Sequence, residues 1–491
     1  MLNIAKTILI NTTFIFFSSV LAKLINVLFI VYASRVLGPS NFGIYALIGT
    51  LTFLFSYFTS FGITPMGVRE IARNRQGVEE LFNNILAIRI CFIAISYFLL
   101  YLTVNLLNYS EEIKTLVYIS AISIFFSTFT STFHILYMAF ERMVIPSLVT
   151  VLNSIINTIL GLTALYLGYG LLGVIWSGVF INVVGAILSG IWVRKMFFKY
   201  RLSVNLKLWI DLLKQALPFA LILFFQQANR HLAVLFLSKL PAPVPQTQAV
   251  GLFNSASALP QSAMMVPASI RQALLPTISV NRDDLEKIKT IIDKITRYIL
   301  IFVSVPLVVL TTFFSKQIIT ILFGKAYIES APALIILGFA YALQAFNTSA
   351  NVTLSSSRDI TRVIPWVGSV TVFNVLLIIP LIYYYSFVGA AVAVLISMTV
   401  NTYGRYYLLK KLWKINVAEF FQTRKALISA VGLFMLCWLV FLLNKNQIFT
   451  FCLIFGLYTA YIYYLGIFSK DEQLFQMIVS KLRRKNGTHH R

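Results

Sequence analysis

The sequence predicts an all-α, polytopic membrane protein, and two observations lead to this class. Of the 491 residues, 59% are hydrophobic and 11% are charged, whereas ordinary soluble domains contain roughly 25% charged residues. The hydrophobic residues gather in runs of about 20, the length that crosses a bilayer core of about 30 Å as a helix. The net charge of +24 fits basic loops at a membrane surface better than nucleic-acid binding, because the basic residues lie between the apolar runs.

We expect about 14 transmembrane helices, with boundaries that follow the apolar runs. The first run is long and uninterrupted, so we interpret it as a retained span and not as a cleaved signal peptide. The runs cover residues 8–33, 42–66, 84–107, 113–137, 146–168, 171–193, 215–238, 248–270, 294–315, 330–354, 363–385, 387–409, 425–443 and 447–467.

The orientation follows from the uneven distribution of Lys and Arg between the two sides of the membrane. With a cytoplasmic amino terminus, the inward segments contain 30 of the 40 basic residues and the outward loops contain 6. Positively charged loops are retained in the cytoplasm, so both termini are expected there. The loops between spans are too short for a soluble catalytic domain, so we expect a protein that is not an enzyme.

An internal repeat relates spans 1–6 to spans 7–12. Both halves enter a span through the tripeptide Val-Ile-Pro, with Pro146 in the first half and Pro365 in the second. The stretch "FGIYALIG" from Phe42 likewise aligns with "VGLFNSAS" from Val250. Six spans per unit place the two units in the same direction, related by an axis along the membrane normal, as in several secondary transporters.

The repeat divides the chain into two pseudo-symmetric six-helix lobes and two smaller segments. We expect an N-terminal lobe over residues 1–200, with helices 1–6, and a C-terminal lobe over 201–415, with helices 7–12. Residues 416–468 form an appended helix pair, helices 13 and 14. Residues 469–491 form a basic cytoplasmic tail.

Two cations occupy matching places near the centres of spans 1 and 7. The stretch "KLINVLFIV" from Lys23 aligns with "RHLAVLFLS" from Arg230. A charge at mid-bilayer is costly and usually faces a bundle interior or a wet cavity, so we predict that Lys23 and Arg230 bind substrate in a central cavity. Residues three or four apart share a helix face. The polar residues predicted to line the cavity with these cations are Ser19, Asn26, Gln226 and Gln227.

Secondary candidates are His231, Arg89 and Arg271. His231 follows Arg230 but points about 100° away, so packing between helices and ligand binding are both open for it. Arg89 and Arg271, with Arg405, lie near the cytoplasmic ends of spans, where anchoring at the interface is the favoured interpretation.

No acidic side chain accompanies the cations inside the spans. All 16 Asp and Glu residues lie in loops or at span ends. A cavity lined with Lys and Arg suits an anionic cargo, and phosphate oxygens are bound well by both side chains. The three cysteines, Cys91, Cys437 and Cys452, all lie inside apolar runs, where each is expected to be a small core residue. No disulfide, metal site or cofactor is expected.

Two prolines in span 8 predict a bend. Pro260 and Pro267 in "LPQSAMMVPAS" each remove a backbone donor and crowd the preceding turn. Freed carbonyl groups at that depth are tolerated only against protein or a water-lined cavity. We therefore expect span 8 to border the cavity, with a hinge at Pro260 and Pro267; a static kink is the alternative.

The stretch "RVLGPSNFGIYALIG", Arg35 to Gly49, resembles the polysaccharide transporter family of the multidrug/oligosaccharidyl-lipid/polysaccharide (MOP) superfamily, and within it the Wzx-type O-antigen flippases. The resemblance covers essentially the whole chain. It implies alternating-access translocation of an undecaprenyl-pyrophosphate-linked oligosaccharide from the cytoplasmic to the periplasmic leaflet of the bacterial inner membrane. Family members commonly have cationic residues in the cavity, and Lys23 and Arg230 fit that role.

Two other functions are alternatives to this one. A drug or ion antiporter of the same superfamily would need an intramembrane carboxylate for its coupling ion, and a membrane-bound glycan ligase or polymerase would need a large outer loop with catalytic groups. The expected partners are the lipid-linked oligosaccharide, membrane lipids and glycan polymerase machinery, with no nucleic acid. Coupling to a proton or sodium gradient is not decided by the sequence, nor is the sugar unit.

Overall fold

Helices make up almost all of the described chain. The computed structural model describes residues 2–280, 284–356, 363–416, 420–443 and 447–464, and none of these residues belongs to a strand. The prediction of an all-α membrane protein is confirmed. The helices are α1 (Leu2–Ser60), α2 (Ile63–Arg73), α3 (Val78–Leu106), α4 (Glu111–Ala139), α5 (Val144–Tyr166), α6 (Gly170–Met196), α7 (Leu206–Leu237), α8 (Gln246–Ala263), α9 (Met265–Val280), α10 (Leu285–Ile299), η1 (Leu300–Ser304), α11 (Val305–Phe313), α12 (Ser315–Leu322), η2 (Lys325–Ser330), α13 (Ala331–Phe346), α14 (Thr348–Ser355), α15 (Ile364–Trp413), α16 (Phe421–Leu443) and α17 (Gln447–Tyr464).

The helices correspond to the predicted spans once two internal turns are recognised. Within the described residues, nine helices are long and apolar enough to cross a membrane, but α1 and α15 each contain two predicted spans. Gly38, with a φ of 73°, turns the chain inside α1, and Ser386, with a φ of 50°, turns it inside α15. Glycine adopts the left-handed region without steric cost. Other predicted spans are divided between consecutive helices, such as residues 330–354 between α13 and α14.

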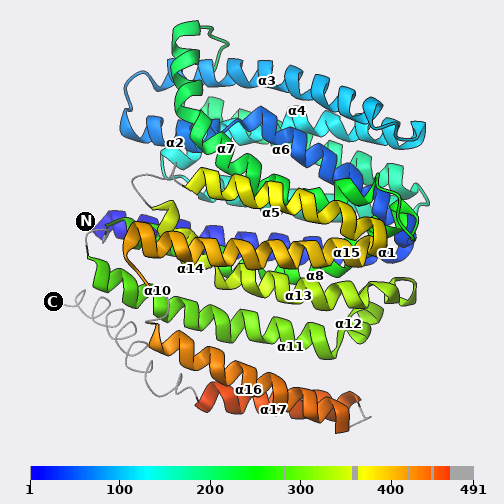
Figure 1. Cartoon of the computed structure of the whole chain (residues 1–491). Coiled ribbons are helices and arrows are strands. Elements are labelled where there is room, and N and C mark those ends of the chain that lie inside the picture. The colour runs from blue at the N-terminus through cyan, green and yellow to red at the C-terminus, as the bar shows by residue number, and fades with distance from the viewer. Residues whose placement is uncertain (1, 281–283, 357–362, 417–419, 444–446, 465–491) are drawn as a thin grey trace, which may run out of the picture.

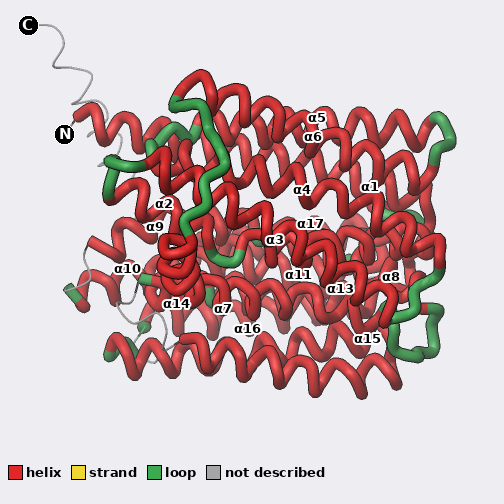
Figure 2. The backbone as a smooth tube through the Cα atoms, turned by 90° about the horizontal axis from the view of Figure 1, so that it is seen from above, coloured by secondary structure: helices red, strands yellow, loops and turns green. Residues whose placement is uncertain are grey.

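The helices lie nearly parallel in one bundle (Figure 1). The start of α1 and the end of α17 lie at one end, which we call the proximal end, and the turns of α1 and α15 lie at the other, the distal end. Seen from above, the helices again run side by side along the same direction (Figure 2). Each helix satisfies its own backbone hydrogen bonds internally, as the bilayer core demands.

Helix α1 is central to the packing. It contacts α3, α4 and α5 of the first predicted lobe and α7 and α8 of the second, so it joins helices of the two lobes. Helix α7 contacts both α2 and α15. The pair α16 and α17 packs against α10 and η1 at one edge of the bundle.

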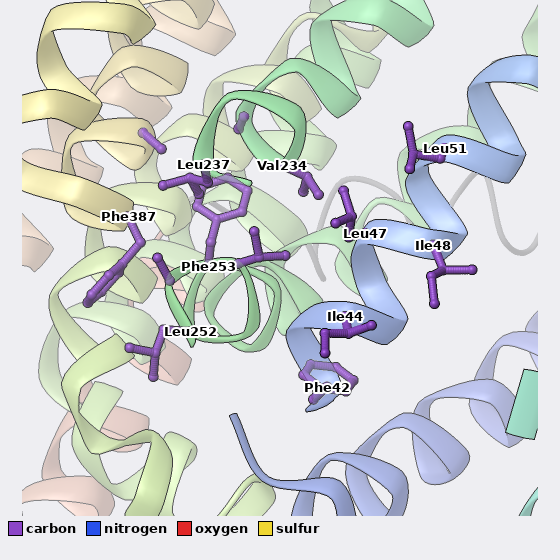
Figure 3. Close-up of a cluster of buried hydrophobic side chains, with 14 of the residues drawn as sticks. Phe42, Ile44, Leu47, Ile48, Leu51, Val234, Leu237, Leu252, Phe253 and Phe387 are labelled. Carbon is purple, nitrogen blue, oxygen red and sulfur yellow. The ribbon is translucent and has the colours of Figure 1, made fainter. Parts of the chain in front are cut away.

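A hydrophobic cluster joins α1, α7, α8 and α15 toward the distal end (Figure 3). Phe42 and Leu47 of α1 are 3% and 2% exposed, and Leu237 of α7 and Leu252 of α8 are fully buried. Each large apolar side chain contributes about 1.5–3 kcal/mol when it is buried from water. Since lipid offers no comparable gain, close packing of the helices matters more at membrane depth.

Glycines bring α1 and α8 into backbone contact within this cluster. A Cβ atom on Gly43 would overlap the carbonyl oxygen of Thr247, and one on Gly251 would overlap the carbonyl oxygen of Pro39. Gly43 and Gly251 are equivalent in the predicted repeat, and Pro39 and Thr247 are separated by the same number of residues. The contact is therefore reciprocal, as a two-fold relation between the two helices requires.

Polar contacts close the distal end further. The hydroxyl of Tyr327 donates to the carbonyl oxygen of Ser34 at 2.8 Å, and the guanidinium of Arg35 donates to the carbonyl oxygen of Leu322 at 2.8 Å. The hydroxyls of Tyr109 and Ser238 share a hydrogen bond of 2.7 Å. Each contact joins the first six predicted spans to the second six.

Candidate functional site

A cavity of about 190 Å³ lies among α7, α9, α13, α14 and α15. Three arginines from three helices line it: Arg230 of α7, Arg271 of α9 and Arg405 of α15. Among the described residues that line the cavity there is no Asp or Glu. The cavity is therefore strongly cationic, and its low-dielectric walls strengthen the attraction of an anion.

The arginines form a row. Arg271 is within electrostatic range of Arg230, and Arg405 is within electrostatic range of Arg271. Arg230 and Arg271 are exposed in the cavity, whereas Arg405 is only partly exposed. The Nε of Arg405 donates to the Oδ1 of Asn401 at 3.0 Å, one turn earlier on α15. This bond fixes the guanidinium plane relative to the cavity wall.

Lys23 extends this row toward the first half of the chain. It lies half-buried on α1, within electrostatic range of Arg230. The two predicted cations thus approach each other from α1 and α7, although the cavity itself is lined by the second half of the chain. Ser19 and Asn26 are exposed on α1 and, with Lys23, lie outside the set of lining residues.

The predicted polar residues of α7 occupy different environments. Gln226 lines the cavity one turn before Arg230, while Gln227 reaches Tyr57 of α1. His231 lies against α1 as well: its Nδ1 is 3.4 Å from the Oγ1 of Thr50, and its ring centroid is 5.0 Å from that of Phe53. These contacts favour packing over ligand binding for His231.

Amides and hydroxyls form the rest of the polar wall. The Nδ2 of Asn229 donates to the Oγ1 of Thr371 at 2.6 Å, and its Oδ1 accepts from the Nδ2 of Asn374 at 3.1 Å. Ser397 donates to the Oδ1 of Asn374 at 2.9 Å. This chain of bonds joins α7 to both halves of α15 and holds the wall in one arrangement.

Two amides present acceptors that no protein donor reaches. Asn347 donates from its Nδ2 to the Oγ1 of Thr402 at 2.7 Å, but its buried Oδ1 has no hydrogen-bond partner among the described residues. The same is true of the Oδ1 of Asn351, one turn along the chain, and both residues line the cavity. A buried polar atom left without a partner costs about 1–3 kcal/mol, so these oxygens are suited to the hydroxyl groups of a ligand.

Arg271 and Arg405 both line the cavity, so the structure favours a place in the candidate site over anchoring at the membrane interface; for Arg271 this agrees with its choice as a secondary candidate. The periodicity of the sequence contained the signal. Ser397, Asn401 and Arg405 recur every four residues, which places them on one helix face, and all three line the cavity. Arg405 alone gives no sign of this helix face; its spacing from Asn401 and Ser397 does.

Arg89 lies away from the cavity, in the first half of the chain. It is 1% exposed, and its guanidinium donates to the hydroxyls of Ser131 at 2.8 Å, Thr132 at 3.0 Å and Thr64. These bonds join α3 to α2 and α4. Its position contradicts anchoring at the membrane interface and indicates that it stabilises the packing of these helices.

Span 8 is divided into two helices by a one-residue interruption at Met264. Helix α8 ends at Ala263 and α9 begins at Met265, so the break lies between Pro260 and Pro267. Pro267 is buried and lines the cavity together with Met264. Arg271, further along α9, also lines the cavity; a hinge at Pro260 and Pro267 stays a prediction.

The fold is that of membrane transporters of the MOP superfamily. A solved structure of the lipid II flippase MurJ in an inward closed conformation matches 94% of this chain and 99% of its own, with a TM-score of 0.73 and 18% identity. An inward-facing multidrug resistance MATE transporter of the MOP superfamily matches 80% of this chain and 96% of its own, with a TM-score of 0.65 and 16% identity. At these identities the likeness concerns the fold alone.

The chain belongs to the polysaccharide biosynthesis protein family, whose model matches residues 8–282. It is 28% identical over 171 residues to the capsular polysaccharide biosynthesis protein CapF of Staphylococcus aureus, and 29% identical over 180 residues to the uncharacterized membrane protein MJ1068 of Methanocaldococcus jannaschii. The matches cover 33% and 36% of this chain, and they span only 42% and 34% of the length of these two relatives.

Proposed function

We propose that this protein is a flippase that moves an undecaprenyl-pyrophosphate-linked oligosaccharide from the cytoplasmic to the periplasmic leaflet of a bacterial inner membrane. The observation that carries the proposal is the cavity lined by Arg230, Arg271 and Arg405 with no acidic residue among its described lining. Arginine is suited to phosphate because its planar fork donates two parallel hydrogen bonds. The family and the fold point to a carrier of sugar-containing lipids.

The polar wall supports the sugar part of the cargo. Carboxamides both donate and accept hydrogen bonds, and the unpartnered oxygens of Asn347 and Asn351 suit sugar hydroxyls. A cationic drug, the cargo of the alternative antiporter, would be repelled by the arginines. The polyprenyl tail would remain in the lipid beside the cavity.

In this proposal both termini are cytoplasmic, so the distal end faces the periplasm. The backbone contact at Gly43 and Gly251 then closes the periplasmic side, and substrate enters from the cytoplasm. Separation of α1 from α8 at the distal end, together with closure of the proximal end, would give access to the periplasmic leaflet.

The test is complementation of bacteria that lack their own flippase and carry a defined glycan gene cluster. We expect this protein to restore surface glycan with at least one cluster, and Arg230→Gln to abolish that restoration at equal membrane abundance. The matched control is Arg194→Gln, because Arg194 lies in the last turn of α6 and outside the cavity. Failure with every cluster, or full activity of Arg230→Gln, would contradict the proposal.

A further inference from the structure

Two exposed arginines lie over a pair of packed phenylalanine rings at the proximal end, where α2 is labelled in Figure 1. The Cζ atom of Arg75, between α2 and α3, is 5.3 Å from the ring centroid of Phe140. The Cζ atom of Arg142, between α4 and α5, is 5.7 Å from the ring centroid of Phe197. The two ring centroids are 5.0 Å apart, and both rings pack on the buried cluster that contains Tyr137. Since a cation within about 6 Å of a ring centroid is attracted to the ring, the rings orient both guanidinium groups.

The backbone next to each arginine is also fixed. The Oδ1 of Asn74 accepts a hydrogen bond from the backbone N–H of Gln76 at 3.0 Å, so Arg75 lies within a closed turn. The backbone N–H of Arg142 donates to the carbonyl oxygen of Tyr137 at 2.8 Å. Little conformational freedom is therefore lost when a ligand binds to either guanidinium, which favours binding.

A third arginine of the proximal end, Arg69 of α2, has its donors occupied. It also lies over an aromatic ring, but its Nε donates to the Oε1 of Glu70 and its Nη2 donates to the Oε1 of Gln215, both at 3.1 Å. In the part of the chain that the structure describes, no acceptor is hydrogen-bonded to the guanidinium of Arg75 or Arg142. These two arginines are oriented like Arg69 but keep their donors available.

The surroundings of the pair are basic. The segments 69–75, 140–143 and 194–201 contain eight basic and two acidic residues. A surface of this charge attracts anions, and the planar fork of arginine binds a phosphate group through two parallel hydrogen bonds. The available donors of Arg75 and Arg142 are therefore suited to phosphate.

Exposed apolar side chains beside the pair favour a lipid as the source of the phosphate. Met196, directly before Phe197, is 40% exposed, and Leu148, in the second turn of α5, is 45% exposed. Both residues lie near the ends of helices that are long and apolar enough to cross a membrane. A phospholipid can place its acyl chains against these side chains and its phosphate against the arginines, whereas a soluble anion contacts only the arginines.

We propose that Arg75 and Arg142 bind the phosphate group of an anionic phospholipid in the leaflet at the proximal end. This leaflet is the cytoplasmic one in the proposed orientation. A lipid held by both arginines would join the segment between α2 and α3 to the segment between α4 and α5. Neither arginine lines the cavity, so the site is independent of the cargo.

The test measures lipid binding to the purified full-length protein in detergent by native mass spectrometry. The probes are phosphatidylglycerol, phosphatidylcholine with the same acyl chains, and inorganic phosphate. Phosphatidylglycerol should bind at least about fivefold more tightly than phosphatidylcholine, because one basic residue near an anionic lipid strengthens binding by a factor of roughly five. A phosphatidylglycerol with a photoreactive headgroup should crosslink to the segments 74–77 and 140–143.

Substitutions assign the binding to the two arginines. Arg75→Gln and Arg142→Gln should each weaken the binding of phosphatidylglycerol about fivefold, and Arg142→Lys should keep part of the affinity, because it keeps the charge without the planar fork. The matched control is Arg69→Gln, which removes the same charge from the same end of the molecule but from a guanidinium whose donors are already occupied. The melting temperature without added lipid shows that each variant is folded.

Each contrary outcome has a distinct meaning. Equal affinity of the unmodified protein for the two lipids would overturn the proposal. An equal loss in Arg69→Gln and Arg142→Gln would show that the basic surface as a whole attracts the lipid and that the two arginines form no site. Displacement of phosphatidylglycerol by inorganic phosphate at the same concentration would identify a soluble anion as the ligand, and crosslinks confined to other segments would place the lipid elsewhere. None of these results changes the complementation test of the proposed function.

Discussion

The glycine contact between α1 and α8 can be opened by a single methyl group. A Cβ on Gly43 would lie 2.8 Å from the carbonyl carbon and overlap the carbonyl oxygen of Thr247, and one on Gly251 would lie 2.9 Å from the carbonyl carbon of Pro39. Carbon atoms pack at about 3.5–4.0 Å. Gly43→Ala therefore forces the two helices apart by about 1 Å.

The energetic cost follows from overpacking. Extra methyl groups in a close-packed region cost about 1–3 kcal/mol, and separation also loosens the contacts of Phe42 and Leu252 nearby. We expect each alanine variant to destabilise the closed distal end by about 2 kcal/mol, equivalent to a shift of roughly 30-fold in the equilibrium between closed and separated arrangements. The double variant Gly43→Ala/Gly251→Ala should cost less than the sum, because the first separation relieves the second overlap.

The assay is pulsed electron spin resonance on the protein in lipid nanodiscs, with spin labels at Ser40 and Gln246. Both residues are exposed and lie next to the contact. We expect the alanine variants to shift the label distances toward longer values. The control is Gly49→Ala on the same helix, where a Cβ meets no atom within 4 Å. A distance distribution shared by Gly43→Ala and Gly49→Ala would refute the reasoning.

Three other predictions concern the cations and the orientation. Lys23→Ala and Arg230→Ala should abolish surface glycan in the complementation assay at unchanged membrane abundance, and Arg230→Lys should retain more activity, because it keeps the charge; full surface glycan in the double alanine variant would exclude the role. Arg89→Ala should lower the free energy of unfolding by about 3 kcal/mol, because it removes charged hydrogen bonds between buried groups, and the purified variant should melt at a lower temperature; an unchanged melting temperature would show that Arg89 is not structural. A cysteine at Gln246 should react with an impermeant thiol reagent in intact spheroplasts, and reaction only after lysis would reverse the orientation.

The sequence by itself determined the class and the spans of this protein. Composition and apolar runs of fixed length suffice for a membrane protein, because a bilayer of given thickness demands a helix of given length. The turns at Gly38 and Ser386 fall between predicted spans, as the run boundaries indicated. The alignment of Lys23 with Arg230 also placed the two cations at comparable depth, and the structure brings them within electrostatic range.

Only the tertiary structure decided which polar residues share a cavity. Periodicity gives the angle of a side chain around its own helix but not which helix faces it, so Arg271 and Arg405 looked like interface residues although both line the cavity beside Arg230. Arg89, which had the same appearance in the sequence, is buried among hydroxyls of α2 and α4. The difference arises from helix packing, which depends on contacts between residues far apart in the chain.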